Sequence, residues 1–65
     1  MLVKFTAVST GLPIYIDARS VVDVKAQADG SSEICYRLGG EQCVTLLVKE
    51  PGSEVSVKIN AHRNR

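Results

Sequence analysis

Two cysteines, Cys35 and Cys43, are the residues whose type and spacing best suit chemistry. They flank Gly39-Gly40, a pair typical of a hairpin turn. In one hairpin register the two thiols are direct cross-strand neighbours, as a disulfide would require. The N-terminal residues alternate apolar and polar types and show no signal-peptide core, so we expect a reducing compartment and structural thiols ahead of a disulfide. A zinc site normally takes four ligands, whereas the chain offers two cysteines and one histidine, so we expect no metal site.

The residues available for acid-base chemistry are scattered along the chain. His62, the single histidine, lies in a polar terminal segment where a solvated side chain is expected. Asp17 and Asp23 lie on different predicted elements beside a turn, where an aspartate more often binds backbone amides. Gly39-Gly40 is too short to cradle a phosphate, which needs a longer glycine-rich loop leading into a helix. We therefore expect no catalytic, cofactor-binding or metal-binding residues.

Aromatic and basic residues give a weak signal for nucleic acid. Tyr15 and Tyr36 are able to stack on bases, but Tyr36 falls on an apolar strand face, where core packing is expected. Arg63 and Arg65 supply little counterion release unless folding gathers other cations beside them. Those cations are Lys4, Lys25 and Lys58. Eight Lys and Arg against seven Asp and Glu give a net charge of +1, which favours neither nucleic acid nor a membrane surface.

Length and composition indicate one small folded domain. The chain has 65 residues, which is too few for two domains. Of these residues 45% are hydrophobic and 23% are charged, close to the averages of globular proteins. No apolar stretch approaches the roughly 20 residues that span a bilayer. We expect one β-rich domain over residues 1–60, a mobile polar tail over residues 61–65, and an unprocessed cytoplasmic protein.

Period-two alternation predicts strands in the first half of the chain. The first covers residues 2–9, and the second, at residues 14–16, is closed by a turn over residues 17–20. The third covers residues 21–27, with alternate side chains on opposite faces. One face of the first strand is expected to hold Val3, Phe5 and Ala7. The third strand is expected to place Val22, Val24 and Ala26 on one face and Asp23, Lys25 and Gln27 on the other.

The register of the hairpin around Gly39-Gly40 decides which side chains share a face. A two-residue loop mixes polar and apolar residues on both faces. A three-residue loop over residues 38–40 gives one consistently apolar face, and we prefer it because burying that face outweighs differences between turn types. This register makes the pairs Ile34 with Val44, Tyr36 with Gln42, Arg37 with Glu41, and Cys35 with Cys43. Its apolar face consists of Ile34, Tyr36, Val44, Leu46 and Val48.

The segment after Pro51-Gly52 has two interpretations. As a strand, Val55, Val57 and Ile59 alternate with polar residues and lie beside the preceding strand. As a helix, Ser53 is the N-cap and Val55 and Ile59 share a face, although two turns of β-branched residues are intrinsically weak. The residues alone leave both open.

A diffuse pattern runs from Leu2 to Ile59. Its residues are Phe5-Thr6, Gly11 before Ile14-Tyr15-Ile16-Asp17, Val21-Val22-Asp23-Val24, Gly39-Gly40, and Val48-Lys49-Glu50 followed by Glu54-Val55 and Ile59. The pattern resembles the FlbD family of short flagellar-operon proteins, also described as swarming-motility proteins. The family's last motif is a short helix, so the resemblance favours the helical interpretation. It implies a bacterial, cytoplasmic, non-catalytic role in motility and supplies no catalytic residue.

The sequence as a whole predicts a mainly β fold, a small antiparallel β-meander or half-open barrel of about five strands that ends in a short helix or a further strand. Unpaired strand edges and the lack of a catalytic constellation favour a protein-interaction or regulatory module rather than an enzyme. Its expected partner is another protein or a second copy of the chain. The alternative is a small β domain that binds nucleic acid. Neither a cofactor nor a membrane is expected.

Overall fold

The computed structural model describes residues 2–40 and 42–63 of the chain. Within this part, five strands form two antiparallel sheets and are followed by a helix, so the mainly β prediction is confirmed. A short 3₁₀ turn, η1 (Ala18–Ser20), joins the second and third strands. The other elements are β1 (Leu2–Thr6), β2 (Pro13–Asp17), β3 (Val21–Ala26), β4 (Ser32–Arg37), β5 (Cys43–Val48) and α1 (Gly52–Arg63).

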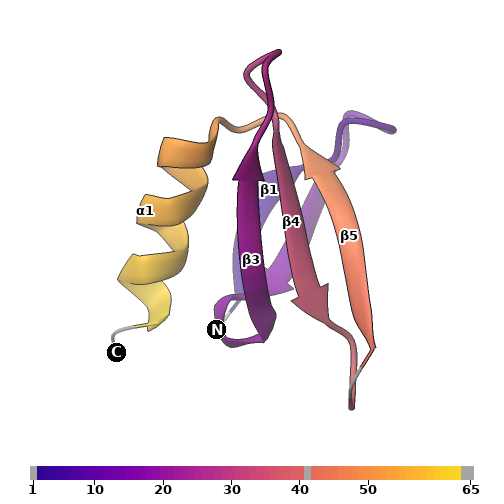
Figure 1. Cartoon of the computed structure of the whole chain (residues 1–65), viewed down its shortest axis with the longest axis vertical. Coiled ribbons are helices and arrows are strands. Elements are labelled where there is room, and N and C mark those ends of the chain that lie inside the picture. Colours follow the sequence, from indigo (N-terminus) through magenta and orange to yellow (C-terminus); the bar gives the residue numbers. More distant parts are fainter. Residues whose placement is uncertain (1, 41, 64–65) are drawn as a thin grey trace.

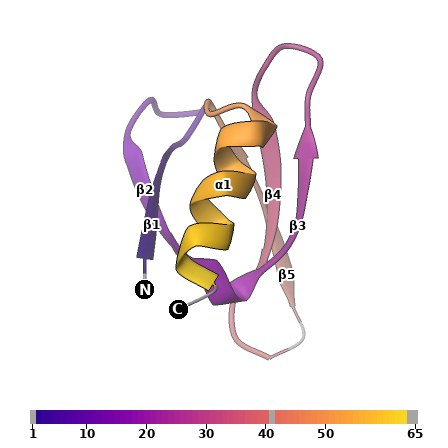
Figure 2. The same ribbon diagram turned by 90° about the vertical axis from the view of Figure 1, so that its left-hand side faces the viewer.

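The two sheets, β1-β2 and β3-β4-β5, face each other as an open half-barrel (Figure 1). They meet at one end, where Ala7 pairs with Val48. The N–H of Val8 donates to the carbonyl of Leu47 at 3.0 Å, and the N–H of Lys49 donates to the carbonyl of Thr6 at 2.8 Å. Along the other side α1 lies across the gap between the sheets and packs against β3, η1 and β1 (Figure 2). The gap between the sheets is therefore covered by a helix rather than by a sixth strand.

The core fills the space between the two sheets and the helix. Each sheet contributes alternate residues, as strand geometry requires, and α1 contributes Val55 and Ile59, one turn apart. The buried members are Val3, Phe5, Ile16, Ala18, Val21, Ile34, Val48, Val55 and Ile59. The expected burial of Val3, Phe5 and Ala7 along β1 is confirmed.

The predicted face of β3 is wrong at its start. Val21 pairs with Tyr36 and Asp23 pairs with Cys35, so Val22 is an extra residue in a β-bulge. Val21 is consequently buried, with 4% of its side chain exposed, whereas Val22 is 52% exposed. Alternation cannot reveal a bulge, because the shift depends on the register of the neighbouring strand.

The faces of the β4-β5 hairpin are as predicted, but its pairing is displaced by two residues. Tyr36 pairs with Val44 rather than Gln42, Cys35 with Thr45, and Arg37 with Cys43. Glu41, the expected partner of Arg37, lies outside the described residues. The loop holds five residues instead of three, and Gly39 and Gly40 adopt φ of 70° and 63°, a region that favours glycine. A shift of two leaves each side chain on its face, so the hydrophobic pattern does not separate the two registers.

The last segment is a helix, not a strand. The strand interpretation would place it beside Val48 on β5, and Ala7 already occupies that position. The helix begins at Gly52, where the N–H of Val55 donates to the carbonyl of Pro51 at 3.0 Å. Ser53 therefore lies inside the first turn and is not the N-cap.

The helix also crosses the predicted end of the domain. It continues past residue 60 and ends at Arg63. A Cβ at Gly52 would meet the Cβ of Ala26 at 3.1 Å, so this close approach of α1 to β3 favours glycine. The remaining residues of the predicted tail, 64 and 65, lie outside the described part of the chain.

Glu50 hydrogen-bonds to β1 and β4 at the meeting point of the sheets. Its carboxylate accepts hydrogen bonds from the Thr6 N–H at 2.9 Å and the Thr6 hydroxyl at 3.1 Å. Its backbone carbonyl accepts from the buried hydroxyl of Ser32 at 2.7 Å. Burial by itself raises the pKa of the Glu50 carboxyl. The hydrogen bonds from Thr6 and the charge of Lys58 together lower this pKa by more, so the net pKa lies below its usual value.

The bulge predicts opposite outcomes for two adjacent valines. Val21→Ala removes buried methyl groups and should lower the free energy of unfolding by about 1–3 kcal/mol, whereas Val22→Ala should change it by less than about 0.5 kcal/mol. Urea denaturation of both variants measures the difference. A larger loss for Val22→Ala would contradict the bulge.

The Glu50 hydrogen bonds predict a specific acid sensitivity. Because folding lowers the pKa of Glu50, its contribution is present above about pH 4.5 and is lost as the pH falls through the folded-state pKa. Glu50→Gln should cost about 1–2 kcal/mol at pH 7 and less at pH 3.5. Glu54→Gln, which removes an exposed i,i+4 ion pair with Lys58, is the matched control and should cost less than about 0.5 kcal/mol. Equal losses for Glu50→Gln at both pH values would contradict the assignment.

Candidate protein-docking edge

The face of β3-β4-β5 that points away from the core carries a mixture of polar, apolar and thiol side chains. We call it the outer face. Its rows follow from the strand register: Asp23, Cys35 and Thr45 in one, Lys25, Glu33 and Leu47 in the next, and Arg37 and Cys43 in the last. The helix lies beside the outer edge of β3, so it flanks this face without covering it (Figure 1).

The first part of β5, Cys43 to Leu46, forms a strand edge that we call the β5 edge. On one side it pairs with β4 throughout. On the other side of β5, the strand pairing among the described residues is limited to the bridge between Val48 and Ala7, beyond the end of this edge. In Figure 1, β5 accordingly forms the margin of its sheet.

Backbone geometry shows which groups point out of the β5 edge. The carbonyl of Leu47 and the N–H of Lys49 bond toward β1 and hence away from β4. Backbone direction alternates along a strand, so Cys43 and Thr45 also direct their N–H and carbonyl groups away from β4. A strand laid beside β5 would find these groups in the correct orientation.

A hollow of about 400 Å³ lies at the end of the β5 edge. Its apolar part includes Val8 and Leu47, of which Leu47 is 44% exposed. Its lining is completed by polar groups from three segments. The lining residues are Val8, Ser9, Glu33, Thr45, Leu46 and Leu47. The hollow therefore combines apolar walls with a polar rim.

Cys35 and Cys43 share the outer face but are not directly opposite, which corrects the predicted pairing. Each is paired with a different residue, so the two cysteines are diagonal neighbours. Both are free thiols, with Cys35 half-buried and Cys43 exposed. Burial raises the pKa of the Cys35 thiol, and the neighbouring Cys43 thiol and the Asp23 and Glu33 carboxylates raise it further.

The other residues considered for chemistry lie apart. The Asp17 carboxylate accepts a hydrogen bond from the Arg19 N–H at 3.0 Å, and this bond is the main cause of its lowered pKa. Asp23 lies on the outer face, and its carboxylate accepts from the Val24 N–H at 2.9 Å. His62 lies in the last turn of α1. Among residues 2–40 and 42–63, no three His, Cys, Asp or Glu side chains form a cluster able to hold a metal ion.

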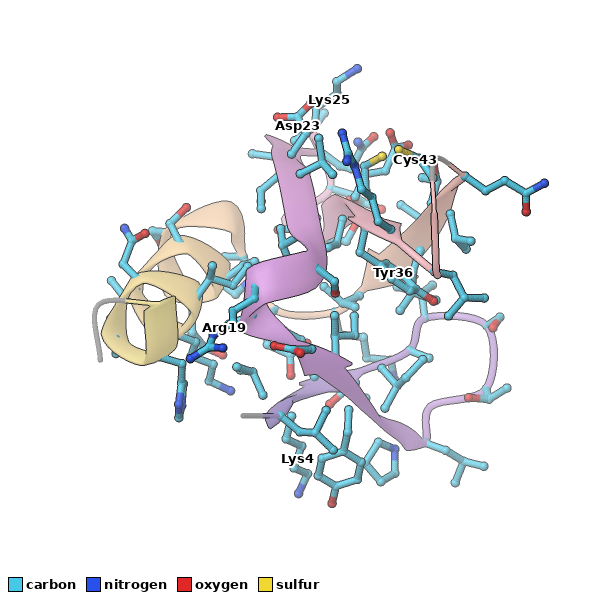
Figure 3. The ribbon with its side chains drawn as sticks, turned by 90° about the horizontal axis from the view of Figure 1, so that it is seen from below. Lys4, Arg19, Asp23, Lys25, Tyr36 and Cys43 are labelled. Atoms are coloured by element: carbon cyan, nitrogen blue, oxygen red, sulfur yellow. The ribbon has the colours of Figure 1, made fainter. Side chains whose placement is uncertain are left out.

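Two of the three lysines considered for nucleic-acid binding lie together, because the Lys58 ammonium donates a hydrogen bond to the Lys4 carbonyl at 3.3 Å. Lys4 and Lys25 lie on opposite sides of the molecule (Figure 3). The ammonium of Lys58 lies 5.5 Å from the centre of the Phe5 ring and pairs with Glu54 at 3.6 Å. The side chains of Arg63 and Arg65 lie outside the described part.

The two tyrosines have different environments. Tyr36 packs against the core, as predicted, and lies on the side of its hairpin opposite Cys43 (Figure 3). Tyr15 is 58% exposed on β2. They therefore do not form one stacking platform.

Sequence reasoning missed Val8 and Leu47. Leu47 was detectable, because the preferred face assignment places odd-numbered residues of this strand on the polar face and Leu47 is the apolar exception. Val8 was not detectable, since it reaches the outer face only through the junction between β1 and β5.

Exposure and pKa predict unequal thiol reactivity. In Cys35→Ser the remaining Cys43 should react with iodoacetamide at pH 7 at least about tenfold faster than the remaining Cys35 in Cys43→Ser. The faster reaction follows from the exposed position of Cys43, and the slower one from the burial and raised pKa of Cys35. Rates are measured by intact-protein mass, and equal rates would contradict the described environments.

Comparison with known proteins yields no relative for this chain: no family model, curated protein or solved structure matches it. Within the described residues, no helix is long and apolar enough to cross a membrane.

Proposed function

We propose that this chain is a small, non-catalytic interaction module that binds an extended segment of a partner protein along the β5 edge. The segment adds a strand to the sheet through main-chain hydrogen bonds, a recurring mode of peptide recognition. The observation that carries the proposal is the outward direction of the Cys43 and Thr45 backbone groups on a stretch with no strand beside it among the described residues.

The hollow supplies selectivity for the added segment. Main-chain hydrogen bonds alone do not distinguish one sequence from another, whereas pockets beside an edge select alternate side chains. The exposed apolar surface of Val8 and Leu47 favours an apolar side chain, and Glu33 beside it favours a neighbouring basic residue.

The outer edges of β3 and β2 are less suited to strand addition. The outer edge of β3 contains the bulge at Val22 and faces α1 across a groove lined partly by Ser56 and Asn60. The outer edge of β2 begins with Pro13, which has no N–H to donate. Bulges, prolines and covering helices are the usual means by which proteins protect edges, and Cys43 to Leu46 has none of them.

The size of the β5 edge favours a partner segment over a second copy of the chain. Only residues 43–46 are open, so two copies paired edge to edge would share about four residues each. A stable interface normally buries about 1,000 Å² or more. A flexible partner segment gains further contact by filling the hollow.

The arrangement of ionisable groups supports a non-catalytic role over catalysis or nucleic-acid binding. Asp17 and Asp23 each bind a backbone amide, on separate elements. Lys25 lies on the opposite side of the molecule from Lys4, and Lys58 lies beside Lys4, so these three lysines do not share one basic surface.

The resemblance to the FlbD family supports a setting for this module in bacterial motility. The family's last motif is a short helix, and the last described element of this chain is the helix α1. We therefore propose a cytoplasmic role in which the partner segment belongs to a component of the motility system.

The test compares two proline variants in a pull-down from bacterial lysate. Thr45→Pro removes an outward N–H from the β5 edge, where β4 needs no donor, so the fold should survive. Tyr15→Pro on the outer edge of β2 is the matched control. We expect the wild-type chain and Tyr15→Pro to capture the same protein, and Thr45→Pro to retain at most about a tenth of it, as loss of a main-chain hydrogen bond and blocked pairing imply.

Three results would contradict the proposal. Capture that is equal for both variants would exclude the β5 edge, as would failure of the wild-type chain to capture any protein. Material that disappears after nuclease treatment would favour nucleic-acid binding instead. Leu47→Lys, which places a charge beside the hollow without touching the core, provides a second weakened variant, and circular dichroism confirms that each variant is folded.

A further inference from the structure

The outer face brings the two thiols of the chain within reach of each other. Cys35 pairs with Thr45 and Cys43 pairs with Arg37, so the cysteines occupy diagonal positions on neighbouring strands. Diagonal positions have Cα atoms about 7–8 Å apart, slightly beyond the usual limit of about 7 Å for a disulfide. Closing the bond therefore needs a small backbone movement.

The end of the hairpin permits this movement. Cys43 is the first residue of β5, and the connection to β4 contains Gly39 and Gly40, both with positive φ. In addition, the described strands leave the far side of β5 without a partner at Cys43. Only the pairing with β4 holds this residue, so its displacement disrupts no other ladder.

We propose that Cys35 and Cys43 form a reversible intramolecular disulfide when the chain reacts with a low-molecular-weight disulfide such as oxidised glutathione. This site stands on the geometry of the hairpin and is independent of the proposed binding at the β5 edge.

The reaction has two exchange steps. The exposed Cys43 thiolate attacks one sulfur of oxidised glutathione, forming a mixed disulfide and releasing one glutathione thiolate. Cys35 then gives its proton to water, and its thiolate attacks the sulfur of Cys43, which releases the second glutathione. The two cysteines lose two electrons, and one glutathione disulfide is reduced to two glutathione molecules.

The diagonal geometry makes this disulfide labile. A bond that requires displaced strands is strained and is more easily reduced than a relaxed one. Burial raises the pKa of the Cys35 thiol, so the second step accelerates as the pH rises. The pair therefore responds to its redox surroundings and does not act as a permanent cross-link.

The test equilibrates the reduced full chain with defined mixtures of reduced and oxidised glutathione, then alkylates free thiols and measures intact mass. The expected product is a monomer about 2 Da lighter than the reduced chain, resistant to alkylation and restored by excess reduced glutathione. Cys35→Ser should instead accumulate a glutathione adduct at Cys43, because the resolving thiol is absent.

A relaxed pair provides the matched control. Cys43→Ser combined with Thr45→Cys places a cysteine directly opposite Cys35, at a spacing suited to a disulfide. Its disulfide should need at least about tenfold more reduced glutathione for half-reduction than the native pair. The proposal fails if the wild-type chain yields only glutathione adducts or disulfide-linked dimers. Equal resistance of the native and control disulfides to reduction would contradict the lability of the Cys35–Cys43 disulfide.

Discussion

The fold depends on the hydrogen bonds that Glu50 makes where the two sheets meet. The carboxylate accepts from Thr6 at the end of β1, while the backbone carbonyl of the same residue accepts from the buried Ser32 hydroxyl on β4. These contacts satisfy polar groups that would otherwise be desolvated without a partner, a cost of about 1–3 kcal/mol for each group. One residue thus joins both sheets immediately before the chain turns into α1.

This junction also explains why the chain ends in a helix. With Ala7 beside Val48, the position next to β5 is occupied at the point where a returning strand would start. The open side of the half-barrel then exposes core residues that need a cover. A helix provides this cover with few apolar residues, because Val55 and Ile59 lie one turn apart on its buried face. Val57, which is 68% exposed, faces solvent. Packing, rather than helix propensity, holds α1 in place.

The same arrangement leaves one face of the β4-β5 hairpin uncovered. The helix and β1-β2 enclose the inner face, so the outer face and the β5 edge remain accessible. The proposed binding segment and the proposed disulfide use different groups of this hairpin. The first uses backbone atoms of Cys43 and Thr45, and the second uses side-chain sulfur atoms on the outer face.

The sequence by itself determined the mainly β class, the buried face of β1 and the two faces of the hairpin, because period-two alternation records which side of a strand is apolar. It left the helix or strand choice open and misplaced the start of β3 and the hairpin pairing. Tertiary structure decided these points for one reason. The bulge at Val22, the pairing of Cys35 with Thr45 and the position of Ala7 beside Val48 each depend on a neighbouring strand. Alternation along a single strand does not record which residue of another strand lies beside it.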